Sequence, residues 1–204
     1  MYKNFIFDFG QVIVKFEPEY ITSAYVKNTE DVKLVKEVVF DRLYWDKLDA
    51  GLITDEEVKN RIRSRLPERL KDVACTVYDN WYYNIPVIHE TVDLIKKIKN
   101  RGGNLFLISN ISKMFAQNYT KVSEIKEIFD LFDGLVFSGP IKLAKPGKEI
   151  FNYALEKFNI KAEESIFFDD NKNNISGANS VGIKGYLFSC DSLNDIDDLI
   201  VNSF

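Results

Sequence analysis

The sequence predicts a doubly wound α/β fold in which a mostly parallel sheet carries an inserted helical segment. Short apolar runs recur along the 204 residues, and segments with helical periodicity separate them. Residues 17–86 differ, because they hold charged helical patterns and no clear strand. The chain is long enough for one large domain with an insert, and 46% hydrophobic residues suffice for a sizeable core.

Five apolar runs are the expected strands. They lack strict alternation of apolar and polar residues, which is typical of strands covered on both faces. In chain order they span residues 4–8, 105–108, 134–137, 165–168 and 185–188.

Helical patterns follow the later strands. Residues 87–100 place apolar side chains at helical spacing and stop at two glycines, which end helices readily. Residues 147–158 and 173–180 predict two further helices. Strand and helix alternate from residue 88 onward, and this order is typical of a doubly wound sheet.

The segment 17–86 predicts a helical insert. Residues 30–39 and 54–65 are its expected helices, and Thr54 with Glu57 forms a capping box. We therefore expect two domains, an α/β core of residues 1–16 and 87–204 and a helical domain of residues 17–86.

Composition restricts the classes of partner and location. The net charge of −4 disfavours nucleic acid or an anionic membrane as the main partner. Cys75 and Cys190 form no CxxC motif, so a disulfide framework or zinc site is not expected. No charge-free apolar stretch resembles a signal peptide or spans a bilayer, and the expectation is a soluble, cytoplasmic monomer or homodimer.

Carboxylates stand at the ends of two apolar strands. Asp8 ends the first strand and Gly10 follows at once, while Asp169 and Asp170 end the fourth. Burying a carboxylate is costly unless it is paired or bound to metal, and ligands of open parallel sheets bind at the carboxyl ends of strands. These residues predict a divalent cation and a phosphate at one edge of the sheet.

Two further polar pairs follow strands, Ser109 with Asn110 and Lys145 with Pro146. Alone, each has an ordinary explanation as a cap or loop residue. Together with the carboxylates, they supply what phosphoryl transfer requires. A carboxylate can attack phosphorus, and a lysine and the N–H groups that open a helix can hold phosphate oxygens.

The predicted site has two parts. Mg²⁺, which prefers oxygen ligands, is expected on Asp8, the Gly10 carbonyl and Asp170. Asp169 and Asn174 are possible further ligands. The phosphate-binding residues are expected to be Phe9, Gly10, Ser109, Asn110 and Lys145.

The chain resembles the haloacid dehalogenase-like hydrolase superfamily over nearly its full length. The family's four motifs match Asp8, Ser109, Lys145 and the Asp169–Asp170 pair in order. FDFGQVI (7–13) and FFDDN (167–171) most resemble the sugar-phosphatase branch that includes α-glucose-1-phosphate phosphatase, and DAGLIT (49–54) resembles its cap loop.

The resemblance implies a Rossmann-like core, with the insert as a cap that closes over the site. It also implies Mg²⁺-dependent hydrolysis of a small phosphomonoester, such as a hexose 1-phosphate. Asp8 would be the nucleophile of an aspartyl-phosphate intermediate, with Lys145 as its catalytic partner.

Gly10 departs from the family pattern, because most of its phosphatases carry an acid/base aspartate there. Such a group contributes about 10²- to 10⁴-fold, or roughly 3 to 5 kcal/mol. The substrate could have an acidic leaving group, another residue could supply the proton, or the protein could be slow or a non-catalytic binding protein. A haloacid dehalogenase is a further alternative, although it would leave the Asp169–Asp170 pair without a purpose.

The aromatic residues of the insert form two groups with different expected roles. Tyr78, Trp81, Tyr82 and Tyr83 are expected to pack between the insert and the sheet rather than to form a ligand wall. Residues 44–47 are better placed for substrate contact, because they lead into the loop around Gly51.

Overall fold

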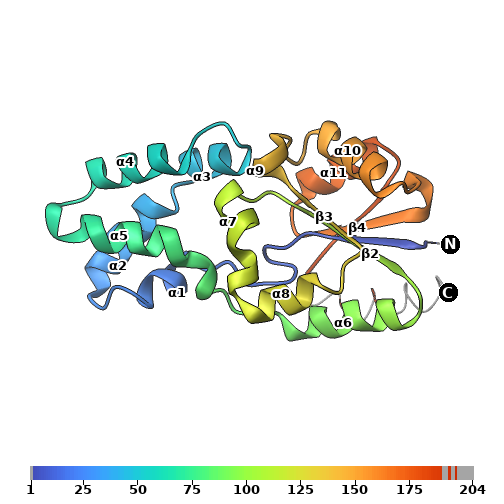
Figure 1. Cartoon of the computed structure of the whole chain (residues 1–204), viewed down its shortest axis with the longest axis horizontal. Coiled ribbons are helices and arrows are strands. Elements are labelled where there is room, and N and C mark those ends of the chain that lie inside the picture. Colours follow the sequence, from blue (N-terminus) through green and yellow to red (C-terminus); the bar gives the residue numbers. More distant parts are fainter. Residues whose placement is uncertain (1, 190–192, 194–195, 197–204) are drawn as a thin grey trace.

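The computed structural model describes residues 2–189, 193 and 196, and Cys190 lies outside them. A five-stranded parallel sheet has the order β3-β2-β1-β4-β5. Helices cover both of its faces, and a group of helices projects from one end of the sheet (Figure 1). The predicted doubly wound α/β fold is confirmed.

All five strands lie where the apolar runs predicted them, and no strand end differs from its predicted position by more than one residue. They are β1 (Asn4–Phe7), β2 (Asn104–Ser109), β3 (Gly134–Phe137), β4 (Ser165–Asp169) and β5 (Lys184–Leu187). Every residue of β1 and β4 is buried. Burial on both faces explains why these runs show no alternation in the sequence.

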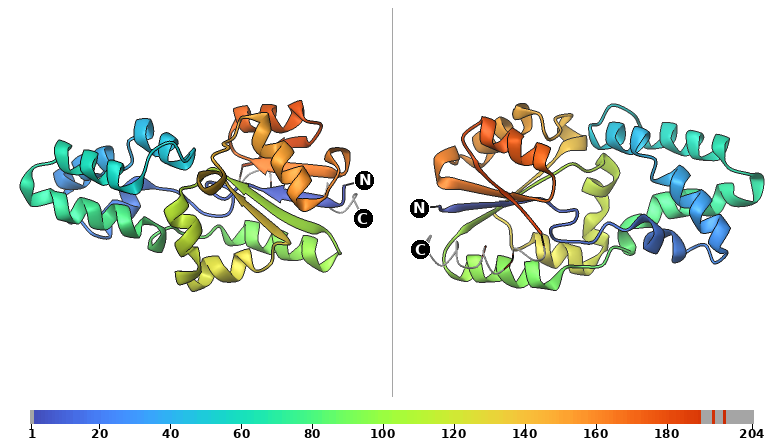
Figure 2. Two further views of the ribbon diagram at one scale, coloured as in Figure 1. Left: turned by 45° about the horizontal axis from the view of Figure 1, so that its top comes forward. Right: turned by 180° about the vertical axis from the view of Figure 1, so that it is seen from behind.

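Successive residues of the central strand face two separate cores. Phe5 and Phe7 belong to the larger core, whereas Ile6 belongs to the smaller one. The larger core lies under α6 (His89–Asn100) and α8 (Ser123–Phe129), and the smaller lies under α10 (Lys148–Phe158) and α11 (Lys172–Ser180). Figure 2 shows the two helical layers on opposite sides of the sheet.

The inserted segment folds into five helices. They are α1 (Pro18–Ser23), α2 (Thr29–Val39), α3 (Arg42–Asp49), α4 (Asp55–Arg65) and α5 (Glu68–Asn80), followed by a 3₁₀ turn at Trp81–Tyr83. The predicted capping box of α4 is present. The Glu57 N–H donates to Thr54 Oγ1 at 3.2 Å, and the Thr54 N–H donates to the Glu57 carboxylate at 2.8 Å. We call residues 18–83 the cap.

The two chain segments that enter and leave the cap lie side by side. Val14 and Val87 form an antiparallel bridge, and the Lys15 N–H donates to the Pro86 carbonyl at 2.8 Å. Trp81 stacks on Phe115 of the core with ring centroids 5.3 Å apart. The predicted packing between insert and core is confirmed for Trp81 and Tyr82, which both contact Phe115, but it is wrong for Tyr83, which is 46% exposed. The cap lies beyond the carboxyl ends of the strands (Figure 1).

Two short helices complete the core around that end, α7 (Lys113–Asn118) and α9 (Ser138–Ile141). The hydroxyl of Ser138, at the start of α9, donates to the carbonyl of Asp49 at the end of α3. A Cβ on Gly51 would lie 2.5 Å from the Gly139 carbonyl oxygen. Cap and core therefore touch backbone to backbone at this point.

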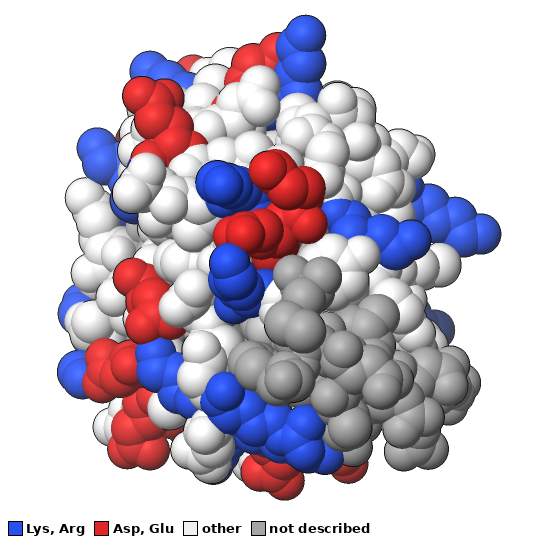
Figure 3. Space-filling model, turned by 90° about the vertical axis from the view of Figure 1, so that its right-hand side faces the viewer, with Lys and Arg blue, Asp and Glu red and all other residues white. Residues whose placement is uncertain are grey.

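The end of the molecule opposite the cap carries basic and acidic side chains interspersed over its described atoms (Figure 3). Lys3, beside β1, pairs with Glu164 at 2.8 Å. This mixed face lacks the one-sided basic footprint of a nucleic-acid-binding surface. None of the helices in the described part of the chain has the length and apolarity that a bilayer crossing needs.

Candidate active site

Three neighbouring strands deliver polar residues to one edge of the sheet. Asp8 follows β1, Ser109 ends β2 and Asp169 ends β4. The Asp8 N–H donates to the Phe168 carbonyl at 2.9 Å, which places Asp8 in line with the end of β4. Chain order reverses between β1 and β4, the position where doubly wound sheets bind ligands.

A cavity of about 540 Å³ lies between this edge and the cap. The core supplies the predicted residues Asp8, Phe9, Gly10, Ser109, Asn110, Lys145, Asp170 and Asn174 to its wall. The cap and its entry supply Phe16, Arg42, Trp45, Asp46, Asp49 and Trp81. The structure therefore gathers these predicted residues around one cavity, and Asp169 contacts Lys145 behind its wall.

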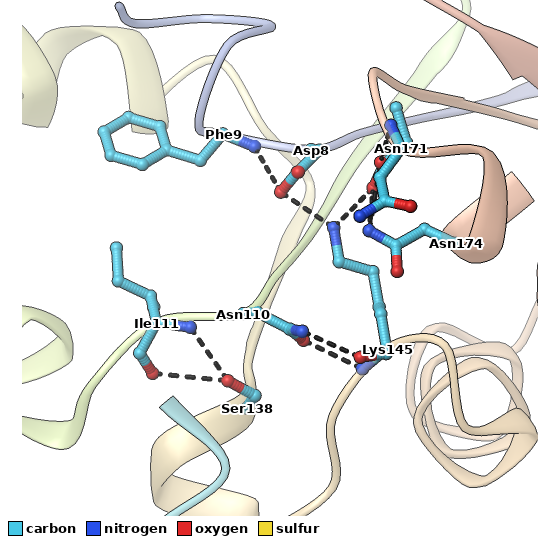
Figure 4. Close-up of polar contacts among 9 residues, drawn as sticks. Asp8, Phe9, Asn110, Ile111, Ser138, Lys145, Asn171 and Asn174 are labelled. Atoms are coloured by element: carbon cyan, nitrogen blue, oxygen red, sulfur yellow. Dashed lines mark hydrogen bonds and ion pairs between the residues drawn. The ribbon is translucent and has the colours of Figure 1, made fainter. Parts of the chain in front are cut away.

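Lys145 stands between two carboxylates (Figure 4). Its Nζ lies 2.8 Å from Asp8 Oδ1 and 2.7 Å from Asp169 Oδ2, and the residue is 4% exposed. Burial alone would lower the pKa of the Lys145 ammonium, but the charges of Asp8 and Asp169 outweigh burial and hold that pKa above its ordinary value. Lys145 is therefore a fixed positive charge beside Asp8.

Asp169 is fully buried, and described donors surround its carboxylate. It accepts from Lys145, from the Asn171 N–H at 2.8 Å, and from Asn174 Nδ2, which lies 3.0 Å from both oxygens. This arrangement fits an anchor for Lys145 better than a direct cation ligand. Asn174, at the start of α11, orients Asp169 in turn.

The side chain of Asn110 makes two hydrogen bonds to the backbone of Lys145. Asn110 Nδ2 donates to the Lys145 carbonyl and Asn110 Oδ1 accepts from the Lys145 N–H, both at 2.8 Å (Figure 4). The peptide bond between Lys145 and Pro146 is cis. The hydrogen bonds between Asn110 and Lys145 join two loops and fix the backbone position from which the Lys145 side chain extends.

Asp8 is 9% exposed and faces the cavity. The Phe9 N–H donates to Asp8 Oδ1 at 2.7 Å, while the Phe9 ring packs in the core against Phe115. Burial raises the pKa of Asp8 to about 7, although Lys145 lowers it. Ser109, at the end of the adjacent strand β2, is 2% exposed and also lines the cavity.

The carboxylates present a surplus of negative charge. One oxygen from each of Asp8, Asp169 and Asp170 lies within 4.8 Å of the others. With all three carboxyls ionised, they and the Lys145 ammonium carry a formal charge of −2. Burial and the charge of Asp169 raise the pKa of Asp170, the exposed member. Asp8, Asp170 and the neighbouring Gly10 carbonyl are oxygen donors of the kind that Mg²⁺ takes, so the residues present fit the ion.

Gly10 leaves a space in the cavity wall. A Cβ built on Gly10 meets no atom within 4 Å. Apart from the two chain neighbours of Gly10, no described side chain therefore occupies the position of the missing acid.

The cap supplies cavity residues from the segment 44–47, which the sequence indicated, and also Arg42 and Asp49, whose place in the cavity it did not indicate. Of residues 44–47, Trp45 and Asp46 line the cavity, whereas the Tyr44 ring lies under Arg61, 4.9 Å from its guanidinium carbon. Arg42 pairs with Asp46 at 2.8 Å. Asp49 lines the cavity and is 9% exposed. The sequence feature that could have identified Asp49 is its position. It directly follows the apolar Leu48 and stands two residues before Gly51 in the cap loop.

Comparison with known proteins gives a family and several relatives. A family model described as haloacid dehalogenase-like hydrolase matches residues 2–182. A sesquiterpene phosphatase of Aspergillus oryzae is 26% identical over 192 residues, which cover 94% of this chain and 92% of the relative. A phosphorylated carbohydrates phosphatase of Thermotoga maritima is 25% identical, with 93% and 86% covered. A D-ribitol-5-phosphate phosphatase of Bacteroides thetaiotaomicron is 23% identical, with 91% of both chains covered.

Solved structures share the fold. A family enzyme from Bacteroides thetaiotaomicron, in complex with magnesium and inorganic phosphate, gives a TM-score of 0.67 at 22% identity and covers 93% of this chain and 95% of its own. The L-2-haloacid dehalogenase of Xanthobacter autotrophicus gives 0.65 at 15% identity, with 95% and 81% covered. At these identities the likeness establishes a common architecture of core and cap.

Proposed function

Because this chain belongs to the haloacid dehalogenase-like hydrolases, we propose that it hydrolyses a small phosphomonoester with the help of Mg²⁺. One observation carries the proposal. The ammonium of the buried Lys145 lies 2.8 Å from the nucleophile candidate Asp8, beside the exposed carboxylate of Asp170, and all three residues line one cavity. The relatives named phosphatases point to the same reaction class.

Each residue has a chemical role in this proposal. Asp8 attacks phosphorus and forms an aspartyl phosphate, which splits one difficult displacement into two steps. Lys145 neutralises a phosphate oxygen beside Asp8, and Ser109 donates to another. Asp169 and Asn110 keep Lys145 in position.

Mg²⁺ would be held by Asp8, Asp170 and the Gly10 carbonyl oxygen. When bound, it supplies positive charge that offsets the repulsion between a carboxylate nucleophile and a phosphate dianion. The net charge of −2 among the surrounding side chains supports a divalent ion at this place.

A sugar phosphate, such as a hexose 1-phosphate, is the first candidate substrate. The cavity of about 540 Å³ lies in the range of small-molecule sites. Arg42, Asp46 and Asn173 add polar groups to its wall that can bond to hydroxyls. The relatives from Thermotoga maritima and Bacteroides thetaiotaomicron are named for phosphorylated carbohydrates and D-ribitol 5-phosphate.

The phosphate of an apolar alcohol is a second candidate. Phe16, Trp45 and Trp81 line the cavity on the cap side and pack as an aromatic group, with ring centroids 5.5 to 5.7 Å apart. Such an aromatic wall can bury the hydrocarbon part of an apolar alcohol. The Aspergillus oryzae relative is named a sesquiterpene phosphatase.

The two remaining alternatives account for fewer observations. A dehalogenase requires no divalent cation, and Asp170 beside Asp8 would then have no evident purpose. A non-catalytic binding protein would not need the buried Lys145 held from both sides by carboxylates.

The experiment is a hydrolysis screen of the purified chain with Mg²⁺ and with excess chelator. The substrates are nitrophenyl phosphate, sugar 1- and 6-phosphates, nucleotides, a terpenoid alcohol phosphate and a 2-haloacid. We expect phosphate release that the chelator abolishes and that Asp8→Asn abolishes as well. The control is Asp72→Asn, which neutralises an exposed cap carboxylate away from the cavity wall.

Each alternative gives a different result. Turnover of the haloacid that survives chelation would establish the dehalogenase. No turnover of any substrate, or Asp8→Asn activity near that of the unaltered protein, would refute the proposed mechanism.

A further inference from the structure

Asp49 of the cap has a buried carboxylate oxygen without a partner. The residue is 9% exposed, and its Oδ1 makes no hydrogen bond among the described residues. Buried polar atoms are nearly always paired, because an unpaired one keeps the full cost of its desolvation. Since Asp49 lines the cavity, the partner it lacks can come from a bound substrate.

The contact between cap and core fixes where Asp49 lies. The Ser138 hydroxyl donates to its carbonyl, and Gly51, two residues later, packs against the backbone of Gly139. The charge of Asp8 is close enough to act on the Asp49 carboxyl. Asp49 is therefore anchored on the cap side of the space whose core side holds Asp8.

The surroundings of Asp49 favour its protonated form. Burial raises the pKa of Asp49 well above its ordinary value, Arg42 lowers it, and the charges of Asp46 and Asp8 raise it further. Tyr78, which also packs nearby, directs its hydroxyl to Asp55 instead. A buried carboxyl whose protonated form is favoured can act as a general acid.

The other carboxylates on the cavity wall already have roles. Asp8 is the proposed nucleophile and Asp170 faces the cation position. Asp46 is paired with Arg42 at 2.8 Å. Among the lining carboxylates of the described chain, this leaves Asp49 available to exchange a proton with substrate.

We propose that Asp49 is the catalytic acid and base that Gly10 does not supply. The inference rests on the proposed phosphatase function. In the first step, Asp8 Oδ bonds to phosphorus, the bond from phosphorus to the alcohol oxygen breaks, and that oxygen takes the Asp49 proton. In the second step, the Asp49 carboxylate takes a proton from water. The water oxygen bonds to phosphorus, and the bond to Asp8 breaks. Asp49 ends protonated, and the products are the alcohol and inorganic phosphate.

The open space at Gly10 is consistent with this arrangement. With no atom within 4 Å of a Cβ at that position, a leaving group can occupy the region that an aspartate would otherwise fill. The proton then arrives from the cap side. Closure of the cap and protonation of the leaving group become one event, so a substrate too small to engage the cap gains less catalysis.

The test compares leaving groups. Asn at position 49 keeps the shape of the side chain but cannot donate a carboxyl proton. We expect Asp49→Asn to lower kcat/KM for an alkyl phosphate by about 10²- to 10⁴-fold. For nitrophenyl phosphate we expect a loss below about tenfold, because nitrophenolate leaves without a proton. The second step also lacks its base, so the variant should release a burst of nitrophenol equal to the enzyme concentration.

Controls separate the inference from the proposed function. Asp49→Ala repeats the comparison with a different side chain, and Asp72→Asn controls for loss of a cap carboxylate. Gly10→Asp in the Asp49→Asn background should restore alkyl phosphate hydrolysis. Equal losses for both leaving groups, or no loss for either, would overturn the role of Asp49 while leaving the phosphatase intact. If the unaltered protein hydrolyses neither substrate, the proposed function fails and the inference fails with it.

Discussion

Lys145→Met tests whether the site depends on one buried cation. Methionine keeps much of the apolar stem and removes the ammonium, which is 2.8 Å from Asp8 and 2.7 Å from Asp169. Removing one partner of a buried ion pair costs about 3–5 kcal/mol, because the other charge stays buried without compensation. Asp169 has no exposed surface, so it cannot recover hydration without local unfolding.

The expected loss of stability in Lys145→Met is a large fraction of the total free energy of unfolding. Proteins are stable by about 5–15 kcal/mol, and 1 kcal/mol shifts Tm by about 2–4 °C in a chain of this size. We therefore expect Tm to fall by about 6–20 °C. Adding Asp169→Asn should recover a large part of this loss, because the second substitution removes the stranded charge but keeps an acceptor for the Asn171 N–H.

The assay is thermal unfolding in excess chelator, followed by circular dichroism, for the two single variants and the double variant. Lys126→Met is the control, because Lys126 pairs with Asp130 at 2.5 Å on the surface and should change Tm little. If Lys145→Met and Lys126→Met shift Tm equally, or if the double variant is less stable than the sum of the single variants predicts, the charge argument is refuted.

Three further variants examine the cavity and the cap. Gly10→Asp has open space for its side chain; it should raise kcat/KM for simple alkyl phosphates more than for anomeric phosphates, and equal gains would contradict the missing-acid interpretation. Gly51→Ala places a Cβ 2.5 Å from the Gly139 carbonyl oxygen at a φ of 67°. This variant should lower kcat/KM for all substrates. An alanine in the left-handed conformation also costs about 1–2 kcal/mol of stability. An unchanged Tm would therefore argue against close packing of the cap on the core at Gly51. Asp49→Asn should remove a pH dependence of stability. Because burial raises the folded-state pKa of Asp49, its protonated form stabilises the fold at low pH, and that contribution is lost as pH rises through the folded-state pKa. The variant should therefore unfold at a higher temperature than the unaltered protein at about pH 8, with the difference closing toward about pH 4; a constant difference would contradict this.

Local patterns in the sequence were enough to predict the sheet. Buried parallel strands require continuous apolar runs, so β1 and β4 were visible without any knowledge of their neighbours. The capping box of α4 was equally local, since Thr54 and Glu57 lie three residues apart. The placement of Asp8 and Asp169 at one edge followed from the rule that parallel strands end together.

The helices of the cap were harder to predict. α3 has eight residues, too few for a periodic pattern to stand out, and α5 contains Thr76 and Val77, which favour helices weakly. Tertiary packing stabilises both helices, because Trp45 and Leu48 of α3 and Tyr78 of α5 are buried in the same core.

The α/β class, the carboxylates at the strand ends and the lack of an acid at position 10 can be read from the chain alone, because each depends on residues that are neighbours in sequence. How these groups work together depends on contacts between distant parts of the chain. Asn110 holds Lys145 across 35 residues, and Ser138 holds Asp49 across 89. Such contacts depend on how the cap folds back onto the sheet, and local periodicity does not encode that geometry. This is why Gly10 could be read from the sequence, whereas the carboxyl proposed to replace its function emerged only from the folded chain.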